Sequence, residues 1–141
     1  MKKNICENKI NHLLMIQSII DRMGKNSFSL KEWSIGIMIA IFAFAGKNTH
    51  RAVIITLIPL IVFWFLDTYY LMIERKFRAL YDDVRVKNES NIDFNMNFND
   101  INLNMKDIKK YSFLSILLSK AIMPFYVVCI ITCLIIYFVK F

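Results

Sequence analysis

The sequence predicts an all-α membrane protein with three transmembrane helices and a helical cytoplasmic stalk. Two observations carry this prediction: a one-sided distribution of basic residues, and three uncharged apolar runs, Trp33–Gly46, Ala52–Leu66 and Ala121–Val139. A bilayer core of about 30 Å needs about 20 helical residues, which the third run supplies unaided. A buried soluble hairpin is the alternative, but a soluble domain of 141 residues with 57 % hydrophobic residues would keep little polar surface.

The N-terminal segment 1–28 is predicted to contain a cytoplasmic amphipathic helix. Its apolar residues recur at helical spacing over residues 10–23. The helix-breaking residues of the stretch 24–27 are predicted to end this helix. Ser29-Leu30-Lys31-Glu32 then has the form of a capping box, so a second helix is expected to begin there.

Residues 29–73 are predicted to form a transmembrane hairpin. The first span is expected over about residues 30–46 and the second over about residues 52–73, lengths of about 25 and 33 Å. Gly46 is a suitable residue to end the first helix and to start a tight external turn. The two spans should therefore be antiparallel neighbours.

Residues 74–120 are predicted to be cytoplasmic and to begin with a stalk that continues the second helix, because apolar residues keep their helical spacing as far as Val84. Polar and apolar residues then alternate over residues 90–105. Alternation favours a short β segment, whereas the many asparagines favour a loop, so both remain open. Lys106–Ser119 is predicted to be a basic interfacial helix that leads into the third span at residues 121–141.

Basic residues predict the orientation in the membrane. Fifteen of the 18 lysines and arginines lie before the first run or between the second and third, and three lie elsewhere. The positive-inside rule then places the N-terminus and the long connection in the cytoplasm, with the hairpin turn and the C-terminus outside. We expect the bacterial inner membrane as the location, with the lipid bilayer as the first partner. No signal peptide is expected, because the opening residues are too polar.

Asp67 is the ionisable residue whose position within a predicted span demands an explanation. It lies about 22 Å along the second span, near the inner interface. Two interpretations are open: a tie between the helices, through an ion pair with Lys31 or a hydrogen bond from Trp33, or a role lining an aqueous path.

Small residues predict how the helices meet. Gly36, Ala40 and Ala43 form a face on the first span that permits close approach of another helix. Three helices cannot enclose an aqueous pore, so transport would require a homo-oligomer, for which a tetramer is the working expectation. On the third span the candidates for either a pore face or helix packing are Cys129, Thr132, Cys133 and Ile136.

Motifs for catalysis are missing from the sequence. It contains no glycine-rich phosphate loop, no serine elbow and no cysteine–histidine spacing of a metal site. His12 and His50 are expected on opposite sides of the membrane and cannot act together. We therefore expect no enzyme, no catalytic residue, no metal and no cofactor.

Motifs around the hairpin resemble those of a known group of proteins. They are Arg22-Met23, Asn26-Ser27-Phe28, Lys31-x-Trp33, Phe63-Trp64-x-x-Asp67-x-Tyr69-Tyr70 and Glu74-Arg75-x-Phe77-Arg78-x-Leu80-Tyr81. In these motifs, which cover about residues 16–85, the chain resembles the SLATT-like membrane effectors of nucleotide-signalling antiphage defence systems. The third span and the asparagine-rich connection depart from a two-helix effector.

The resemblance implies an oligomeric effector that depolarises the inner membrane, as a channel or pore, when a nucleotide or oligonucleotide binds on the cytoplasmic side. The enzyme that makes this ligand would be a further partner. Candidate ligand-binding residues are Lys106, Lys109, Lys110, Tyr111, Lys2 and Lys3, for which lipid headgroups are the competing ligand. The alternative function is a non-conducting membrane anchor or scaffold that recruits a soluble protein.

Overall fold

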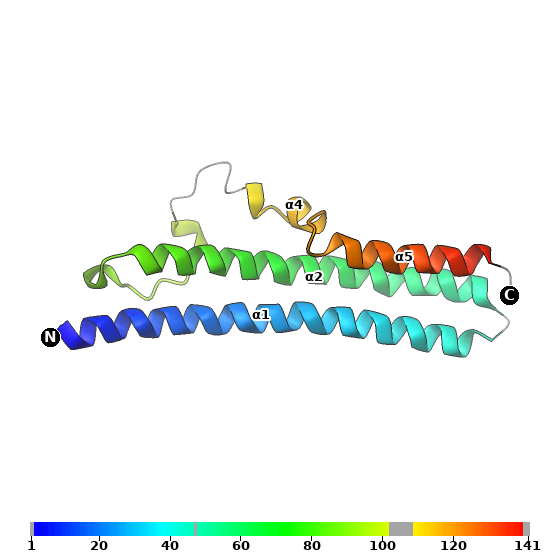
Figure 1. Ribbon diagram of the computed structural model, residues 1–141, viewed down its shortest axis with the longest axis horizontal. Helices are drawn as coiled ribbons and strands as arrows, with labels where there is room; N and C mark the ends of the chain where they lie inside the picture. Colours follow the sequence, from blue (N-terminus) through cyan, green and yellow to red (C-terminus); the bar gives the residue numbers. More distant parts are fainter. Residues whose placement is uncertain (1, 47, 102–108, 140–141) are drawn as a thin grey trace.

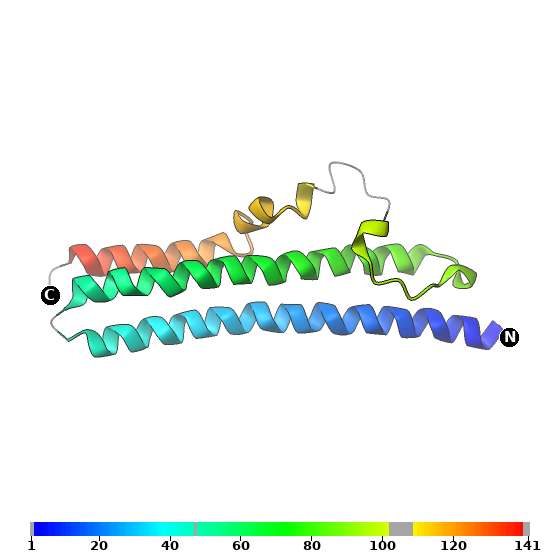
Figure 2. The ribbon, with the colours of Figure 1, turned by 180° about the vertical axis from the view of Figure 1, so that it is seen from behind.

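Two long antiparallel helices form the body of the protein (Figures 1 and 2). The computed structural model describes residues 2–46, 48–101 and 109–139, with the side chains of residues 2–6 and 90 excepted. Helix α1 spans Lys2–Ala45 and helix α2 spans Thr49–Val86. The two helices pack side by side along their lengths. A helix of 44 residues is about 66 Å long, roughly twice the thickness of a bilayer core. The described residues are helical, with no strand among them.

Both long helices are apolar and long enough to cross a membrane. The candidate membrane spans are Glu7–Ala45 in α1 and Thr49–Val86 in α2. Their most apolar windows have mean hydropathies of 1.5 and 2.0. Only 6 % of the window in α1 and 33 % of that in α2 is buried inside the protein. The core helix of a soluble domain would be mostly buried, so these exposed apolar surfaces support a membrane location.

The hairpin and the stalk have the predicted form. Gly46 ends α1 with a φ of +54°, a conformation that glycine adopts readily, and the amide of Asn48 donates to the carbonyl of Ala45 at 3.0 Å. Helix α2 then continues without a break from the apolar run into the stalk and ends at Val86.

The predicted break at residues 24–27 is wrong, because α1 is one continuous helix. Two of the helix-breaking residues, Gly24 and Ser27, lie at the contact with α2. A Cβ atom at Gly24 would lie 3.5 Å from the Glu74 carboxylate, an ordinary van der Waals contact, so Gly24 lies directly beside the stalk. Ser27 is buried and donates a hydrogen bond to α2. Tertiary packing therefore outweighs a helix-propensity penalty of about 1 kcal/mol for glycine.

The amphipathic stripe of residues 10–23 is buried by the stalk. Ile16 and Ile20 of α1 form one core with Leu80 and Val84 of α2, all at most 4 % exposed. Partly buried residues of the connection that follows α2 extend this core, and they are Ile92, Met96 and Ile101. The N-terminal half of α1 and the C-terminal half of α2 thus share an apolar core of their own.

The connection after α2 contains no strand over residues 90–101, and residues 102–105 of the predicted β segment lie outside the described residues. Two short 3₁₀ helices, η1 at Glu89–Asn91 and η2 at Phe98–Asp100, flank an irregular stretch. Within it the amides of Asn95, Asn97 and Asn99 each donate to the side chain two residues earlier, at 2.8–3.1 Å. These Asx turns satisfy locally the backbone groups that a strand would pair with a neighbour. The period of two therefore reflects a series of turns.

The predicted interfacial helix Lys106–Ser119 is broken in its described part. Lys109 and Lys110 are helical, Ser112 has an extended backbone at φ −69° and ψ 140°, and the short helix α4 follows at Phe113–Leu117. An N-cap residue typically has an extended backbone, so Ser112 marks the start of a new helix. Residues 106–108 lie outside the described residues.

The third apolar run forms helix α5, Met123–Phe138, which lies along the half of α2 near the hairpin turn (Figures 1 and 2). It has 16 residues, a length of about 24 Å, and is therefore shorter than the predicted span of residues 121–141. Pro124 lies in its first turn, where proline needs no amide partner and has a suitable φ. Proline thus starts the helix instead of interrupting it.

Candidate functional site

A charged residue, Asp67, lies in the interior between α1 and α2 and is 0 % exposed. Its carboxylate oxygen Oδ2 lies 2.6 Å from Nζ of Lys31, the ion pair that the sequence predicts. The Ser27 hydroxyl donates to the other oxygen, Oδ1, and Lys31 Nζ also donates to this hydroxyl at 3.1 Å. Because Ser27 and Lys31 are four residues apart, they share one face of α1 and both contact the carboxylate.

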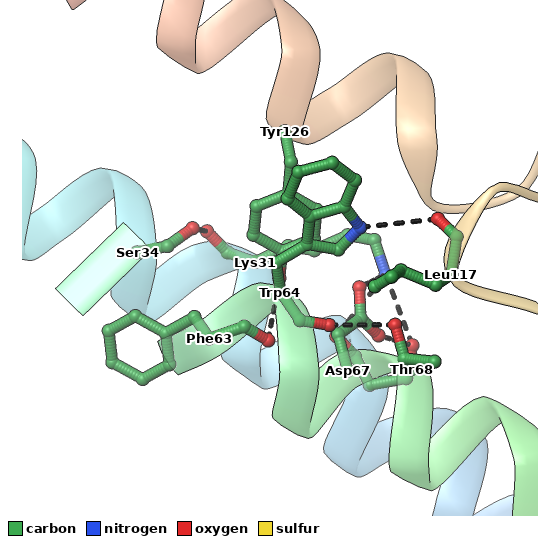
Figure 3. A network of polar contacts seen from close by, with 9 residues as sticks. Lys31, Ser34, Phe63, Trp64, Asp67, Thr68, Leu117 and Tyr126 are labelled. Atoms are coloured by element: carbon green, nitrogen blue, oxygen red, sulfur yellow. Dashed lines mark hydrogen bonds and ion pairs between the residues drawn. The ribbon is translucent and has the colours of Figure 1, made fainter. Parts of the chain in front are cut away.

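Aromatic residues from two helices, α2 and α5, lie beside this ion pair (Figure 3). The rings of Trp64 on α2 and Tyr126 on α5 are stacked, with centroids 5.8 Å apart and an angle of 9° between the planes. Tyr126 donates its hydroxyl hydrogen to the carbonyl of Phe63 at 3.3 Å, and the Trp64 indole donates to the carbonyl of Leu117 on α4, also at 3.3 Å. These bonds fasten α4 and α5 to α2 at the level of Asp67.

The arrangement around Asp67 is that of a tie between helices. Both carboxylate oxygens have partners, and no part of the side chain is exposed to line an aqueous path. Trp33, the other predicted partner, is 65 % exposed and lies at the surface. The Lys31 side chain is 21 % exposed, so part of it reaches the surface while Asp67 stays buried.

The four candidate pore or packing residues of α5 divide between two environments. Cys129 and Cys133 are buried against the hairpin, and Cys133 Sγ lies 4.0 Å from the sulfur of Met38 on α1. Thr132 is exposed and donates its hydroxyl hydrogen to the Val128 carbonyl, while Ile136 is half-buried. Packing within one protomer thus occupies the two cysteines, and Thr132 faces outward.

The small-residue face of α1 lies at the surface of the protomer. Gly36, Ala40 and Ala43 are all exposed. A Cβ atom added at Gly36 would meet no atom within 4 Å. Ala40 borders a space of about 480 Å³ together with Arg51, Ala52 and Ile55 of α2, so α2 lies beside one end of this face, while Gly36 has open space around it.

Two of the candidate ligand-binding residues line a cavity. Lys110 and Tyr111 border a space of about 370 Å³ together with residues of the stalk and of α4, which are Arg75, Arg78, Ala79, Asp82 and Ser115. Lys109 is exposed and does not line it. Lys106 and the side chains of Lys2 and Lys3 lie outside the described part of the chain.

The comparisons with known proteins give no identity. No known protein family, curated protein or solved structure matches this chain. The resemblance to SLATT-like effectors therefore rests on the motifs of residues 16–85 alone.

The sequence alone does not predict the roles of several residues around Asp67 and along the cavity. Ser27 was assigned to a turn, although its spacing of four from Lys31 places both on one helical face. The sequence predicts Arg75 and Arg78 as cytoplasmic basic residues and as part of a motif, and their spacing of three, which directs both to the same side of the stalk, is the signal for their place in one cavity. Tyr126 carries no such local signal, because its role depends on how α5 docks against α2.

Proposed function

We propose that the chain is a homo-oligomeric effector of the bacterial inner membrane, with the N-terminus in the cytoplasm and the C-terminus outside. The two exposed apolar helices support the membrane location. The distribution of 15 basic residues against three supports the orientation. The cytoplasmic core of α1 and α2 is consistent with this orientation, since it buries apolar residues as a soluble helical pair does.

The observation that carries the proposal is the exposed small-residue face of α1. Small residues at a spacing of four and three permit close backbone approach between helices in a bilayer, where van der Waals packing drives association. Within one protomer nothing approaches Gly36. A second copy of the chain is the partner that this face fits, and closed symmetry would then give a ring.

In this proposal the assembled protein conducts ions and depolarises the membrane. Each copy would contribute one helix to the pore, and Thr132 supplies an outward-facing hydroxyl on α5. Such a pore has no ring of charge on α5 and would select ions weakly. The motif resemblance supports a role in antiphage defence and control by a nucleotide or oligonucleotide.

The second candidate function is a non-conducting anchor that recruits a soluble protein. It is favoured by the burial of Cys129 and Cys133, which leaves α5 with little polar surface for a pore. The two functions differ in conductance, because only the first requires a continuous aqueous path.

Replacing Gly36 by leucine should prevent assembly. The added side chain has open space within the protomer, so the fold should be kept, whereas a neighbouring helix could no longer approach closely. We expect wild-type protein in mild detergent to be oligomeric by size-exclusion chromatography with light scattering, and Gly36→Leu to run as protomers. Ile39→Leu, which changes an apolar residue that is 61 % exposed, is the matched control. Equal oligomer size in Gly36→Leu and wild type would refute this interface.

A further inference from the structure

The cavity beside the stalk is formed by two parts of the chain that are distant in sequence. Arg75, Arg78 and Asp82 come from α2, and Lys110, Tyr111 and Ser115 come from the segment before α5. Its volume of about 370 Å³ lies within the range of small-molecule sites, about 300–1,000 Å³. A ligand here would contact both the stalk and the segment that leads to α5.

The lining of the cavity carries an excess of positive charge. Three cationic side chains face one carboxylate, that of Asp82. Asp82 is in turn 3.4 Å from the Arg85 guanidinium, so its charge is shared with a cation outside the cavity. The lining itself thus carries three cations and one carboxylate, with the Glu74 carboxylate beside it at 2.8 Å from Arg78, a positive balance that suits an anion.

Arg78 forms an ion pair with Glu74 that an anionic ligand can displace. The Arg78 side chain is 63 % exposed, and its guanidinium lies 2.8 Å from the carboxylate of Glu74, whose side chain is 12 % exposed. Exposed pairs at this helical spacing contribute little, about 0.3–0.5 kcal/mol. A doubly charged ligand would compete well for this guanidinium, because arginine binds phosphate oxygens through two parallel hydrogen bonds.

The remaining polar groups match a phosphate as well. The hydroxyls of Tyr111 and Ser115 are possible donors to phosphate oxygens. The Tyr111 ring is supported edge-to-face by Phe98, with centroids 5.2 Å apart. A phosphate group carries a charge of about −1.5 to −2 near neutral pH, which the positive lining would attract.

We propose that this cavity binds the phosphate group of a ligand on the cytoplasmic side of the membrane. The inference rests on the proposed function for its orientation, because Arg75 would lie about 3 Å beyond the inner end of the second span. Both anionic phospholipid headgroups and free phosphorylated molecules reach that level. The bound phosphate would contact Arg75 and Arg78 on α2 and Lys110 on the segment that precedes α5. It would thereby hold that segment against the stalk and so regulate the position of α5.

Binding is tested with inorganic pyrophosphate in one arm and with lipid in the other. In neutral detergent at constant ionic strength, isothermal titration calorimetry should detect pyrophosphate binding to wild type. In nanodiscs, phosphatidylglycerol added to phosphatidylcholine should raise the thermal stability of wild type. Arg75→Gln and Lys110→Gln should each weaken the effect by about tenfold or more, the loss expected for one charge-assisted contact. Arg22→Gln removes the same charge from an exposed position on α1 and is the matched control.

The site is supported if Arg75→Gln and Lys110→Gln both weaken pyrophosphate binding or the stabilisation by phosphatidylglycerol and Arg22→Gln does not. The measurement that shows this effect identifies the source of the phosphate. Equal effects in all three variants, or no response in either arm, would overturn it. Circular dichroism checks that each variant is folded, and Arg78→Gln replaces any that is not. Pyrophosphate binding can be measured on single protomers as well as on oligomers. A failure of binding at the cavity is therefore distinguishable from a failure of the chains to assemble through Gly36.

Discussion

Replacing Asp67 by alanine should lower the free energy of unfolding by about 3 kcal/mol, the lower part of the range for breaking a buried ion pair. The change leaves Lys31 and Ser27 without the carboxylate that both contact. The partial exposure of the Lys31 side chain, 21 %, allows some solvation and keeps the loss from being larger. The measurement is unfolding in mixed micelles with increasing SDS, followed by circular dichroism.

Two further variants separate the ion pair from general damage to α2. Asp82→Ala removes a carboxylate that is 66 % exposed from the same helix and should cost at most about 1 kcal/mol. The double replacement Lys31→Met with Asp67→Leu should recover most of the stability, because apolar residues can substitute for a complete buried pair. If Asp67→Ala is no more destabilising than Asp82→Ala, the tie between α1 and α2 has been misassigned.

Replacing Tyr126 by alanine should cost about 3–5 kcal/mol, since the side chain is 0 % exposed and its removal leaves a cavity. The change also removes the stacking on Trp64 and the hydrogen bond to Phe63. We expect α5 to separate from the hairpin. Cys129 and Cys133, which are buried in the wild type, should then react with a maleimide in a Cys6→Ser background.

Tyr126→Phe is the control for that experiment. It retains the ring and loses one hydrogen bond, so the expected cost is about 1 kcal/mol and the cysteines should stay protected. Rapid labelling of both cysteines in wild-type protein, or continued protection in Tyr126→Ala, would show that α5 is not held to α2 by this residue.

Periodicity and charge predicted the parts of the fold that depend on local pattern. The turn at Gly46, the continuation of α2 into the stalk and the Lys31–Asp67 pair follow from residue type and spacing. The continuity of α1 through Gly24 does not, because α2 packs against those residues and stabilises a helix that the local sequence disfavours. Tertiary contacts of this kind are not visible in a single sequence.

Asparagines explain why the connection after α2 forms the loop, and not the strand, of the two alternatives left open by the sequence. Alternating polar and apolar residues predict a strand when the backbone must find partners on a neighbouring chain segment. Here Asp93, Asn95 and Asn97 accept from the backbone themselves, so the same pattern gives turns. Hydrogen bonding to Asn95 also holds the pKa of the exposed Asp93 carboxyl below its usual value. The side chains that create the alternation thus supply the reason that no strand forms.

The position of the Asp67 tie relates the two halves of the molecule. It lies between the core around Ile16 and Leu80 and the half of the hairpin near Gly46, and α4 and α5 are fastened at the same level through Trp64 and Tyr126. The basic cavity lies a short way along the stalk. In the proposed effector, a ligand in the cavity would act on α5 next to this rigid junction.

Planar-bilayer recording of the purified oligomer tests the central claim, that assembled copies of this chain conduct ions. Wild type and Ile39→Leu should give reproducible unitary currents with weak ion selectivity, in the presence or absence of pyrophosphate. Gly36→Leu, which removes the interface while leaving the protomer intact, should give none. Oligomers shown by light scattering to be assembled, yet silent in every lipid and pyrophosphate condition, would contradict the channel and favour the non-conducting anchor.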